Sequence, residues 1–143
     1  MTTDQEDEIY QLDEQVGFLL RLASQRHAVI FQNHIKENLT GTQFSTLMRL
    51  AEHGRVTQNH LGRLASMDIA TTKGVVDRLR VKGLVKSEPD KTDKRRSVIS
   101  LTDKGSALST KLKHHGKDIT AETLSPISAR EQDILIGMLK KIS

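Results

Sequence analysis

The sequence predicts a mainly α-helical chain that carries one small β-hairpin. Towards both ends of the chain, apolar residues recur at steps of three and four, the spacing of amphipathic helices. Within residues 84–101, two segments of alternating character flank a polar loop, as expected for a hairpin. Just before it, residues 57–82 predict a short helix, a turn and a longer helix. Helix, turn, helix and hairpin in this order describe a winged helix-turn-helix.

The N-terminal part is expected to form two helices. Residues 1–8 are polar and acidic, and without an apolar partner they are expected to fray. Helical spacing then continues from residue 8 to residue 37, which predicts one helix about 45 Å long. So small a domain cannot cover that helix, so part of it is expected to pack against another subunit. Thr40 and Gln43 have capping-box spacing and predict the start of a second helix.

Capping residues mark the two helices of the central stretch. Thr57 is placed to cap the short helix, and Asp68 to cap the longer one, which is predicted over residues 69–82. Gly83 follows as the C-terminal stop. The side of the longer helix that faces the core is expected to consist of Ile69, Thr72, Val75, Val76 and Leu79.

The remaining elements are predicted from alternation and from further caps. Residues 84–88 and 97–101 are expected to pair as strands, and residues 55–56 to form a short extended link. Thr102 is placed to cap a long helix. Residues 128–131 have the capping-box pattern and predict a last helix that runs to the end of the sequence.

Positive charge is concentrated on the stretch that is predicted to be the winged helix. The whole chain has a net charge of +4 and an isoelectric point near 9.5. Residues 1–53 carry four Lys or Arg against eight Asp or Glu, residues 54–104 carry twelve against six, and residues 105–143 carry six against four. A basic surface on this fold favours a polyanion as the partner.

Several classes of protein are excluded by features that the sequence lacks. It contains no apolar run of about eighteen residues and no charged, apolar leader, so neither a membrane span nor a secretory signal is expected. The protein is therefore expected to reside in the cytoplasm. It contains no cysteine, which excludes disulfides, thiolate metal sites and thiol-based redox sensing.

Metal binding and catalysis are not expected either. His27 and His34 lie roughly 10 Å apart along one predicted helix, too far to share a zinc ion, and the adjacent His114 and His115 face different directions. No Gly-rich phosphate loop, nucleophile elbow or metal-binding helix motif is present. The sequence therefore predicts no metal, no cofactor and no enzymatic activity.

The helix over residues 69–82 is the candidate DNA-reading element. Its outward first turn is small and polar, so its backbone can approach base edges closely. Thr71 and Lys73 can reach donors and acceptors in the major groove, whereas Arg78, further along, is expected to meet phosphate or to pair with Asp77. The alternative is a solvated basic face. The short helix before it and the basic hairpin after it favour DNA binding, because all three match one docking mode.

The loop between the predicted strands is the second DNA-binding candidate. Its basic side chains lie at a loop tip, where they can enter a narrow minor groove or clamp phosphates; a charged loop that serves solubility is the alternative. Asp93 lies two residues from Arg95, close enough to pair with it and stiffen the loop. The residues expected to contact DNA are Thr57, Gln58, Ala70, Thr71, Thr72, Lys73, Gly74, Arg78, Lys91, Lys94, Arg95 and Arg96.

These two elements resemble the MarR family of bacterial transcriptional regulators. The resemblance rests on the helix sequence DIATTKGVVDRLRVKGLV and on the wing sequence EPDKTDKRRSVISLTDKG. The matching positions are Asp77-Arg78-Leu79, Lys82-Gly83-Leu84-Val85, Asp93, Lys94, Arg95, Leu101, Thr102 and Gly105. The chain departs from the family at Gly74, where several members place a side chain on the groove. Base reading is therefore expected to fall on Thr71, Thr72 and Lys73.

The resemblance implies a homodimeric regulator that is associated with the nucleoid in the bacterial cytoplasm. Its dimerisation helices are expected at residues 8–37 and 103–143, and its winged helix at residues 40–101. Two winged helices on one face of double-stranded DNA would read a pseudo-palindrome with half-sites about 34 Å apart. Such proteins usually repress a promoter and release it when a small molecule changes the distance between the winged helices. The first helix resembles members that regulate the breakdown of nicotinate or other aromatic acids.

The resemblance also implies a small aromatic carboxylate as the effector, bound where the first helix meets the second. The candidate ligand-binding residues are Phe18, Arg21, His27, Phe44 and Met48. Arg21 could pair with a carboxylate, and the two phenylalanines could sandwich a ring. The alternative for each is a structural role, since the spacing of most of them is that of core residues. The alternative function is an architectural or protein-interaction dimer without a small-molecule switch, in which the crevice would be filled.

Overall fold

The computed structural model describes residues 9–143, so the expectation for residues 1–8 lies outside the described part. After a single 3-10 turn at Leu12–Glu14 come α1 (Val16–His34), α2 (Gly41–His53), β1 (Val56–Thr57), α3 (Gln58–Leu64), α4 (Ile69–Val81), β2 (Val85–Pro89), β3 (Ser97–Leu101), α5 (Asp103–Leu124) and α6 (Ala129–Ile142). Helices dominate and the strands form one small sheet, which confirms the predicted fold class.

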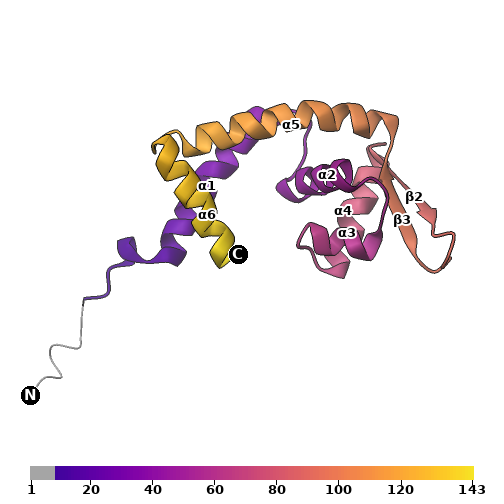
Figure 1. Ribbon diagram of the computed structural model, residues 1–143, viewed down its shortest axis with the longest axis horizontal. Helices are drawn as coiled ribbons and strands as arrows, with labels where there is room; N and C mark the ends of the chain where they lie inside the picture. Colours follow the sequence, from indigo (N-terminus) through magenta and orange to yellow (C-terminus); the bar gives the residue numbers. More distant parts are fainter. Residues whose placement is uncertain (1–8) are drawn as a thin grey trace, which may run out of the picture.

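The molecule consists of two parts that α5 connects. At one end of α5, α1 and α6 lie close to its C-terminal half; these three segments are called the arm below (Figure 1). At the other end, α2, α3, α4 and the strands lie against the N-terminal half of α5 and form the winged helix (Figure 1). The arm therefore extends away from the winged helix (Figure 1).

The core lies in the winged helix and continues to the point where α1 meets α5. Each of α2, α3, α4, β3 and α5 contributes at least one fully buried side chain, among them Leu47, Leu61, Leu79, Ile99 and Leu112. Complete burial of a side chain of this size stabilises the fold by about 1.5–3 kcal/mol. The five elements therefore form one cooperative unit, and α5 belongs to it as much as the helix-turn-helix does.

The predicted helix starts are confirmed by their hydrogen bonds. Thr40, Thr57, Asp68, Thr102 and Ser128 each accept a hydrogen bond from the backbone N–H three residues further on. Reciprocal capping boxes form at the starts of α2 and α6. These contacts involve only near neighbours in the sequence, so local chemistry is sufficient to predict them.

The prediction of one continuous helix over residues 8–37 is wrong. The backbone is extended at Gln11 and Gln15, so α1 begins at Val16, and it ends at His34 because Ile35 is extended again. Ile9 is 85% exposed and buries no apolar surface that could hold a helical turn in place. Residue 8 itself lies outside the described residues.

The inward stripe of α4 needs one correction. Thr72, Val75, Val76 and Leu79 are buried as predicted, but Ile69 is 78% exposed. Its exposed position in the first turn of α4 leaves the side chain facing solvent rather than the core.

The sheet has three antiparallel strands in the order β1-β3-β2. β2 and β3 form the predicted hairpin, with Val85 opposite Leu101 and Pro89 opposite Ser97. The predicted extended link is a true strand, displaced by one residue, and Val56 lies opposite Ile99 of the hairpin. This pairing brings the start of α3 next to the base of the wing.

Candidate DNA-binding surface and ligand crevice

The N-terminal turn of α4 is held by Asp68. Its carboxylate accepts a hydrogen bond of 2.7 Å from the backbone N–H of Thr71. That backbone hydrogen bond, with further hydrogen bonding from the same residue, lowers the pKa of the Asp68 carboxyl below its ordinary value of 3.8. The cap leaves the side chains of Ala70, Thr71 and Lys73 exposed on the outer side of the helix, as a DNA-reading element requires.

The expectation that Thr72 contacts DNA is wrong, because its side chain is 2% exposed. Its hydroxyl donates a hydrogen bond of 2.7 Å to the backbone carbonyl of Asp68, within the first turn of α4. A contact with DNA would require this hydrogen bond to break. The same hydroxyl lies where α3 and α4 are closest, 2.6 Å from the position that a Cβ on Gly62 would occupy. Thr72 therefore joins the two helices of the helix-turn-helix and does not face a groove.

Arg78 extends back along α4 rather than away from it. One guanidinium nitrogen of Arg78 lies 3.2 Å from the position that a Cβ on Gly74 would occupy. Asp77 pairs with Arg80, at 3.6 Å, so it does not hold Arg78. The absence of a side chain at Gly74 therefore gives the Arg78 guanidinium room on the face that carries Thr71 and Lys73.

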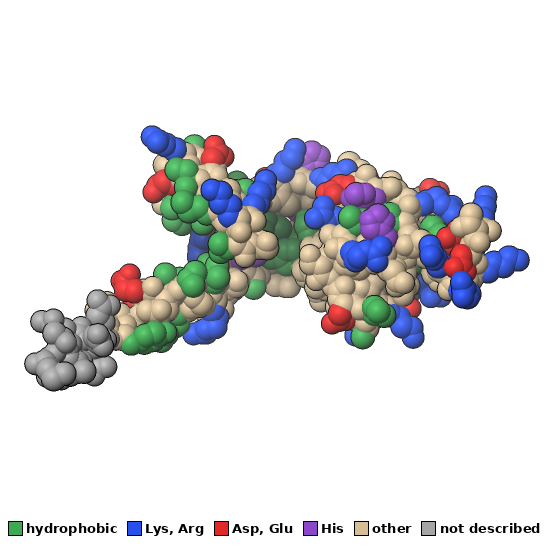
Figure 2. All heavy atoms as spheres, turned by 60° about the horizontal axis from the view of Figure 1, so that its bottom comes forward, with side chains coloured by type: hydrophobic (Ala, Val, Ile, Leu, Met, Phe, Trp, Pro, Cys, Tyr) green, Lys and Arg blue, Asp and Glu red, His purple; other side chains and the backbone are tan. Residues whose placement is uncertain are grey.

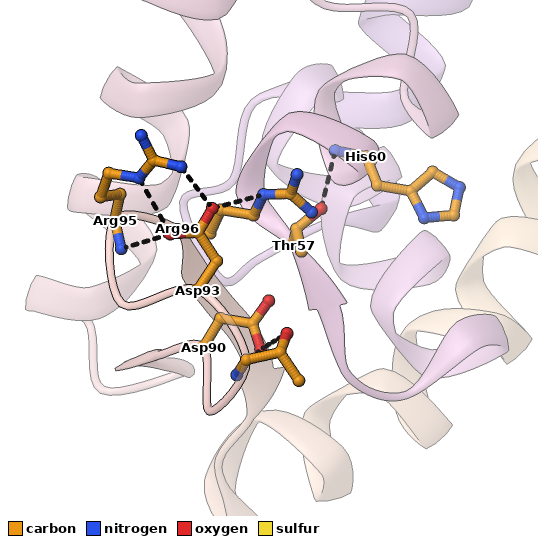
Figure 3. A network of polar contacts seen from close by, with 7 residues as sticks. Thr57, His60, Asp90, Asp93, Arg95 and Arg96 are labelled. Carbon is orange, nitrogen blue, oxygen red and sulfur yellow. Dashed lines mark hydrogen bonds and ion pairs between the residues drawn. The ribbon is translucent and has the colours of Figure 1, made fainter.

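Asp93 organises the basic wing, as its place in the sequence predicts. Its carboxylate accepts hydrogen bonds from the backbone N–H and the guanidinium of Arg95, at 3.1–3.2 Å, and pairs with Arg96 at 3.5 Å (Figure 3). The Arg95 hydrogen bonds, first from the side chain and then from the backbone, hold the pKa of Asp93 below 3.8. Lys91 and Lys94 project from the same loop and are exposed.

A polar cavity of about 320 Å³ separates the wing from the start of α3. It is lined by Thr57, Gln58, Asn59, Arg63, Arg95, Arg96 and Ser97. Three guanidinium groups on one cavity suit a phosphate, which accepts several charge-assisted hydrogen bonds at once. Gln58, Asn59 and Arg63 also line a neighbouring cavity that reaches the start of α4, so the polar surface is continuous.

Asn59 and Arg63 are candidates that the sequence analysis missed. The signal was present, since the two residues lie four apart on α3 and therefore share one face of the helix. The packing of that face against the wing depends on the pairing of β1 with β3, which residue spacing does not reveal.

A second cavity, of about 410 Å³, lies between the arm and the winged helix and is the candidate ligand crevice. Figure 2 shows the molecule hollowed between these parts, with hydrophobic side chains inside the hollow. His27 and Phe44 both line the cavity, as predicted. His27 Nδ1 lies 2.8 Å from the Thr123 hydroxyl, and Phe44 packs edge-to-face on Phe31, with ring centroids 5.5 Å apart.

Three of the five predicted ligand residues do not line this cavity. Arg21 stacks on Phe18, with its guanidinium carbon 5.3 Å from the ring centroid, and both residues lie nearer the N-terminus of α1 than the cavity does. Met48 packs against the core instead. The residues that sequence analysis missed are Ala28, Phe31, Gln32, Gly41, Ser45, Gly116, Ile119 and Thr120. Seven of the ten lining residues thus come from α1 and α5, and apart from His27 they carry no distinctive motif.

Across residues 9–143, no three His, Cys, Asp or Glu side chains are grouped as metal ligands. In the same range, no helix combines the length and apolar character needed to cross a membrane.

A winged helix with a basic wing, a capped reading helix and a guanidinium-lined cavity defines a nucleic-acid-binding class. The MarR family model matches residues 39–97. The repressor NicR of Pseudomonas putida is 37% identical over 93% of this chain and 85% of its own length. The chain belongs to the MarR family, whose members are DNA-binding transcriptional regulators rather than enzymes.

Solved structures agree over nearly the whole chain. A "probable transcriptional regulator" from Pseudomonas aeruginosa is 44% identical, with a TM-score of 0.90 over 93% of this chain and all of its own. BpsR of Bordetella bronchiseptica is 33% identical, with a TM-score of 0.89 over 94% of this chain and 97% of its own. The DNA binding of BpsR is regulated by 6-hydroxynicotinic acid. A mutant MarR from E. coli in complex with operator DNA is 25% identical, with a TM-score of 0.84 over 95% of this chain and 99% of its own.

Proposed function

We propose that this protein is a homodimeric repressor that binds a pseudo-palindromic operator and releases it when a small aromatic acid fills the crevice. The observation that carries the proposal is the continuous polar surface from the wing, over α3, to the start of α4, with Arg63, Arg95 and Arg96 on one cavity. We place the repressor on the nucleoid, in the cytoplasm.

The exposed apolar surface of the arm supports the dimer. Large hydrophobic side chains on α1 and α6 are between 38% and 68% exposed, and α6 buries none of its residues. Apolar faces of this extent on monomers mark interfaces. With the arms paired about a two-fold axis, each winged helix would meet one half-site, and half-sites would lie about 34 Å apart.

Binding to the protein's own promoter region tests the repressor directly. Fluorescence anisotropy with labelled promoter DNA would follow affinity through a salt titration. Neutralisation of six to ten phosphates predicts an affinity loss of roughly 10³–10⁵ between 50 and 200 mM salt. An affinity that is flat with salt, or random DNA that competes as well as the promoter, would overturn the proposal.

Two groups of variants separate affinity from sequence reading. Arg63→Ala and Arg95→Ala should weaken binding to cognate and random DNA alike, because both arginines line the basic cavity beside the wing, where they can contact the DNA backbone. Thr71→Ala and Lys73→Ala should instead reduce the preference for cognate DNA, by about 1–3 kcal/mol for a lost base contact. Arg130→Ala, on the first turn of α6 in the arm, is the matched control and should leave both affinities unchanged.

The open crevice favours a ligand-responsive regulator over an architectural dimer, in which side chains would fill it. Its walls combine the Phe44 ring with polar groups of His27, Gln32 and Thr120, which suits an aromatic acid with ring substituents. BpsR, a close structural relative, responds to 6-hydroxynicotinic acid, so that compound is the first effector to test.

Thermal shift with 6-hydroxynicotinate tests the effector. At 100 times its dissociation constant, a ligand stabilises the folded state by about 2.7 kcal/mol. His27→Ala should abolish most of the shift, and the compound should change operator affinity in the anisotropy assay. If nicotinate, 6-hydroxynicotinate and benzoate all leave both measurements unchanged, the aromatic-acid proposal is wrong, whereas the DNA-binding proposal is unaffected.

A further inference from the structure

A third cavity, of about 390 Å³, lies at the N-terminal half of α5. Its walls are the end of α2, the end of β3 and one face of α5. It shares no lining residue with the crevice between the arm and the winged helix. Ser109 and Gly116, one from each cavity, lie seven residues apart on α5, or roughly 10 Å along the helix axis.

Ser109 is the unexplained residue of this cavity. Its side chain lines the cavity and is 2% exposed, yet its hydroxyl has no hydrogen-bond partner within residues 9–143. Serine hydroxyls in helices can bond to a backbone carbonyl of the preceding turn, as the Thr110 hydroxyl does with Ser106. A buried polar atom without a partner is rare, because burial removes the hydrogen bonds that water supplied.

The side of α5 that faces the cavity is polar where a core-facing helix would be apolar. Ser106, Ser109, Thr110 and Lys113 follow helical spacing on that side. Within the described residues, Lys113 forms no ion pair, so its ammonium group is available to a ligand anion; the other cation of the lining, Arg55, pairs with Glu88 at 3.5 Å.

The charges are arranged along the cavity. Asp103 and Lys113 both line it and lie ten residues apart on α5, or about 15 Å along the helix axis. A ligand anion would therefore sit at the Lys113 end, and ligand groups that donate hydrogen bonds would face Asp103. The lining contains no Phe, Tyr or His, so it offers no ring to stack on an aromatic ligand.

We propose that this cavity is a second small-molecule site, which takes an aliphatic hydroxycarboxylate. The carboxylate pairs with Lys113 and accepts the hydrogen bond that the Ser109 hydroxyl lacks. The ligand's own hydroxyls donate towards Asp103 and exchange hydrogen bonds with Ser106 and Thr110. The apolar atoms of Leu50 and Leu101 cover its carbon chain. The cavity size lies within the range of small-molecule sites.

Titration of the full-length protein with D-gluconate and with the shorter glycerate, followed by amide NMR without DNA, tests the site. Saturable shifts are expected at Gly54, Arg55 and residues 106–113, and not at Phe44 or Gly116. Ser109→Ala and Lys113→Met should each weaken binding about tenfold, which corresponds to 1.4 kcal/mol. Lys117→Met removes a cation one turn further along α5 that does not line the cavity, and should change nothing.

Thermal stability separates a ligand role from a structural one. Since the Ser109 hydroxyl has no partner to lose, Ser109→Ala should melt at the same temperature as the parent protein or higher. The proposal is overturned if neither acid shifts these amides, if neutral glucose shifts them equally, or if Ser109→Ala and Lys113→Met bind gluconate as tightly as the parent protein. Because no DNA or aromatic acid is involved, these outcomes do not depend on the proposed repressor function.

Discussion

Single side chains decide how the wing presents its charge. Without Asp93, four basic residues within six positions would repel one another and leave the loop without a fixed shape. With it, Arg95 and Arg96 both pair with one carboxylate (Figure 3), and both residues line the cavity beside α3. The pairing is exposed, so its value is in orientation rather than in global stability.

Acid titration should release the wing. Because the folded-state pKa of Asp93 is lowered below 3.8, the pairing is present at neutral pH and is lost as the pH falls below that value. In NMR titration of the carboxyl carbon, Asp93 is expected to titrate below 3.8 and to move up towards 3.8 in Arg95→Ala. An unchanged pKa in that variant would contradict the assigned cause.

Gly116 limits the space in the candidate ligand crevice. A Cβ at this position would lie 3.2 Å from the outer ring carbon of Phe44. Gly116→Ala should therefore displace the ring and weaken aromatic-acid binding about fivefold, or roughly 1 kcal/mol. Alanine also favours the helix by about 1 kcal/mol over glycine, so the melting temperature should not fall.

Gly137→Ala is the matched control for that substitution. A Cβ at Gly137, in the interior of α6, meets no atom within 4 Å in this subunit. Titration calorimetry should give parental affinity for this variant. Equal affinity for Gly116→Ala and the parent protein would show that Phe44 is not part of the binding site.

At the scale of elements, the start of α5 lies unusually close to β2. A Cβ on Gly105 would lie 2.0 Å from the carbonyl oxygen of Leu84, which also accepts the backbone N–H of Thr102. The sequence match to the family includes this glycine, and the structure supplies its physical reason. Only a glycine lets the long helix begin directly on the wing, so that the wing and the arm share one rigid element.

Gly105→Ala should disturb that junction. The backbone has to move, because the clashing atom belongs to a carbonyl rather than to a flexible side chain, and overpacking of this kind costs about 1–3 kcal/mol. Chemical denaturation should report the loss. Gly137→Ala serves as the control here too, and no loss of stability in Gly105→Ala would mean that α5 can shift freely on the wing.

At the scale of the whole molecule, the arm carries apolar surface that one subunit leaves uncovered. Figure 2 shows green side chains along the arm and blue ones around the wing at the far end. Leu19 and Leu20 on α1 and Met138 and Ile142 on α6 are all at least 42% exposed. We therefore expect the arm to hold the dimer and the winged helix to hold the DNA, with α5 between them.

A charge on the arm should separate the subunits. Leu20→Asp places a carboxylate in the proposed interface, so light scattering should give the monomer mass, and operator affinity should fall because two half-sites are no longer linked. Val81→Asp is the control for the mass measurement, since Val81 is 88% exposed at the end of α4, outside the arm. A Leu20→Asp protein that stays dimeric would contradict the assignment of the arm.

Local signals predicted most of the fold. The caps at Thr40, Asp68 and Ser128 and the spacing of the hairpin involve residues within a few positions of each other, and all were confirmed. The first helix was predicted too long because apolar spacing reports where a helix could form, whereas packing decides how far it extends. The burial of Thr72, by contrast, follows from the helical spacing that placed it on the core-facing side of α4, and the DNA contact expected of it conflicted with that spacing.

The sequence by itself determined the class of this protein. The order of helices, the basic stretch at residues 54–104 and the pair Asp93-Arg95 follow from neighbouring residues and need no tertiary information. The tertiary structure alone decided which distant residues share a cavity: Arg63 with Arg96, His27 with Phe44, and Lys113 with Arg55. The physical reason is that a binding site is built from side chains whose separation in space depends on how whole elements pack, which residue spacing does not encode.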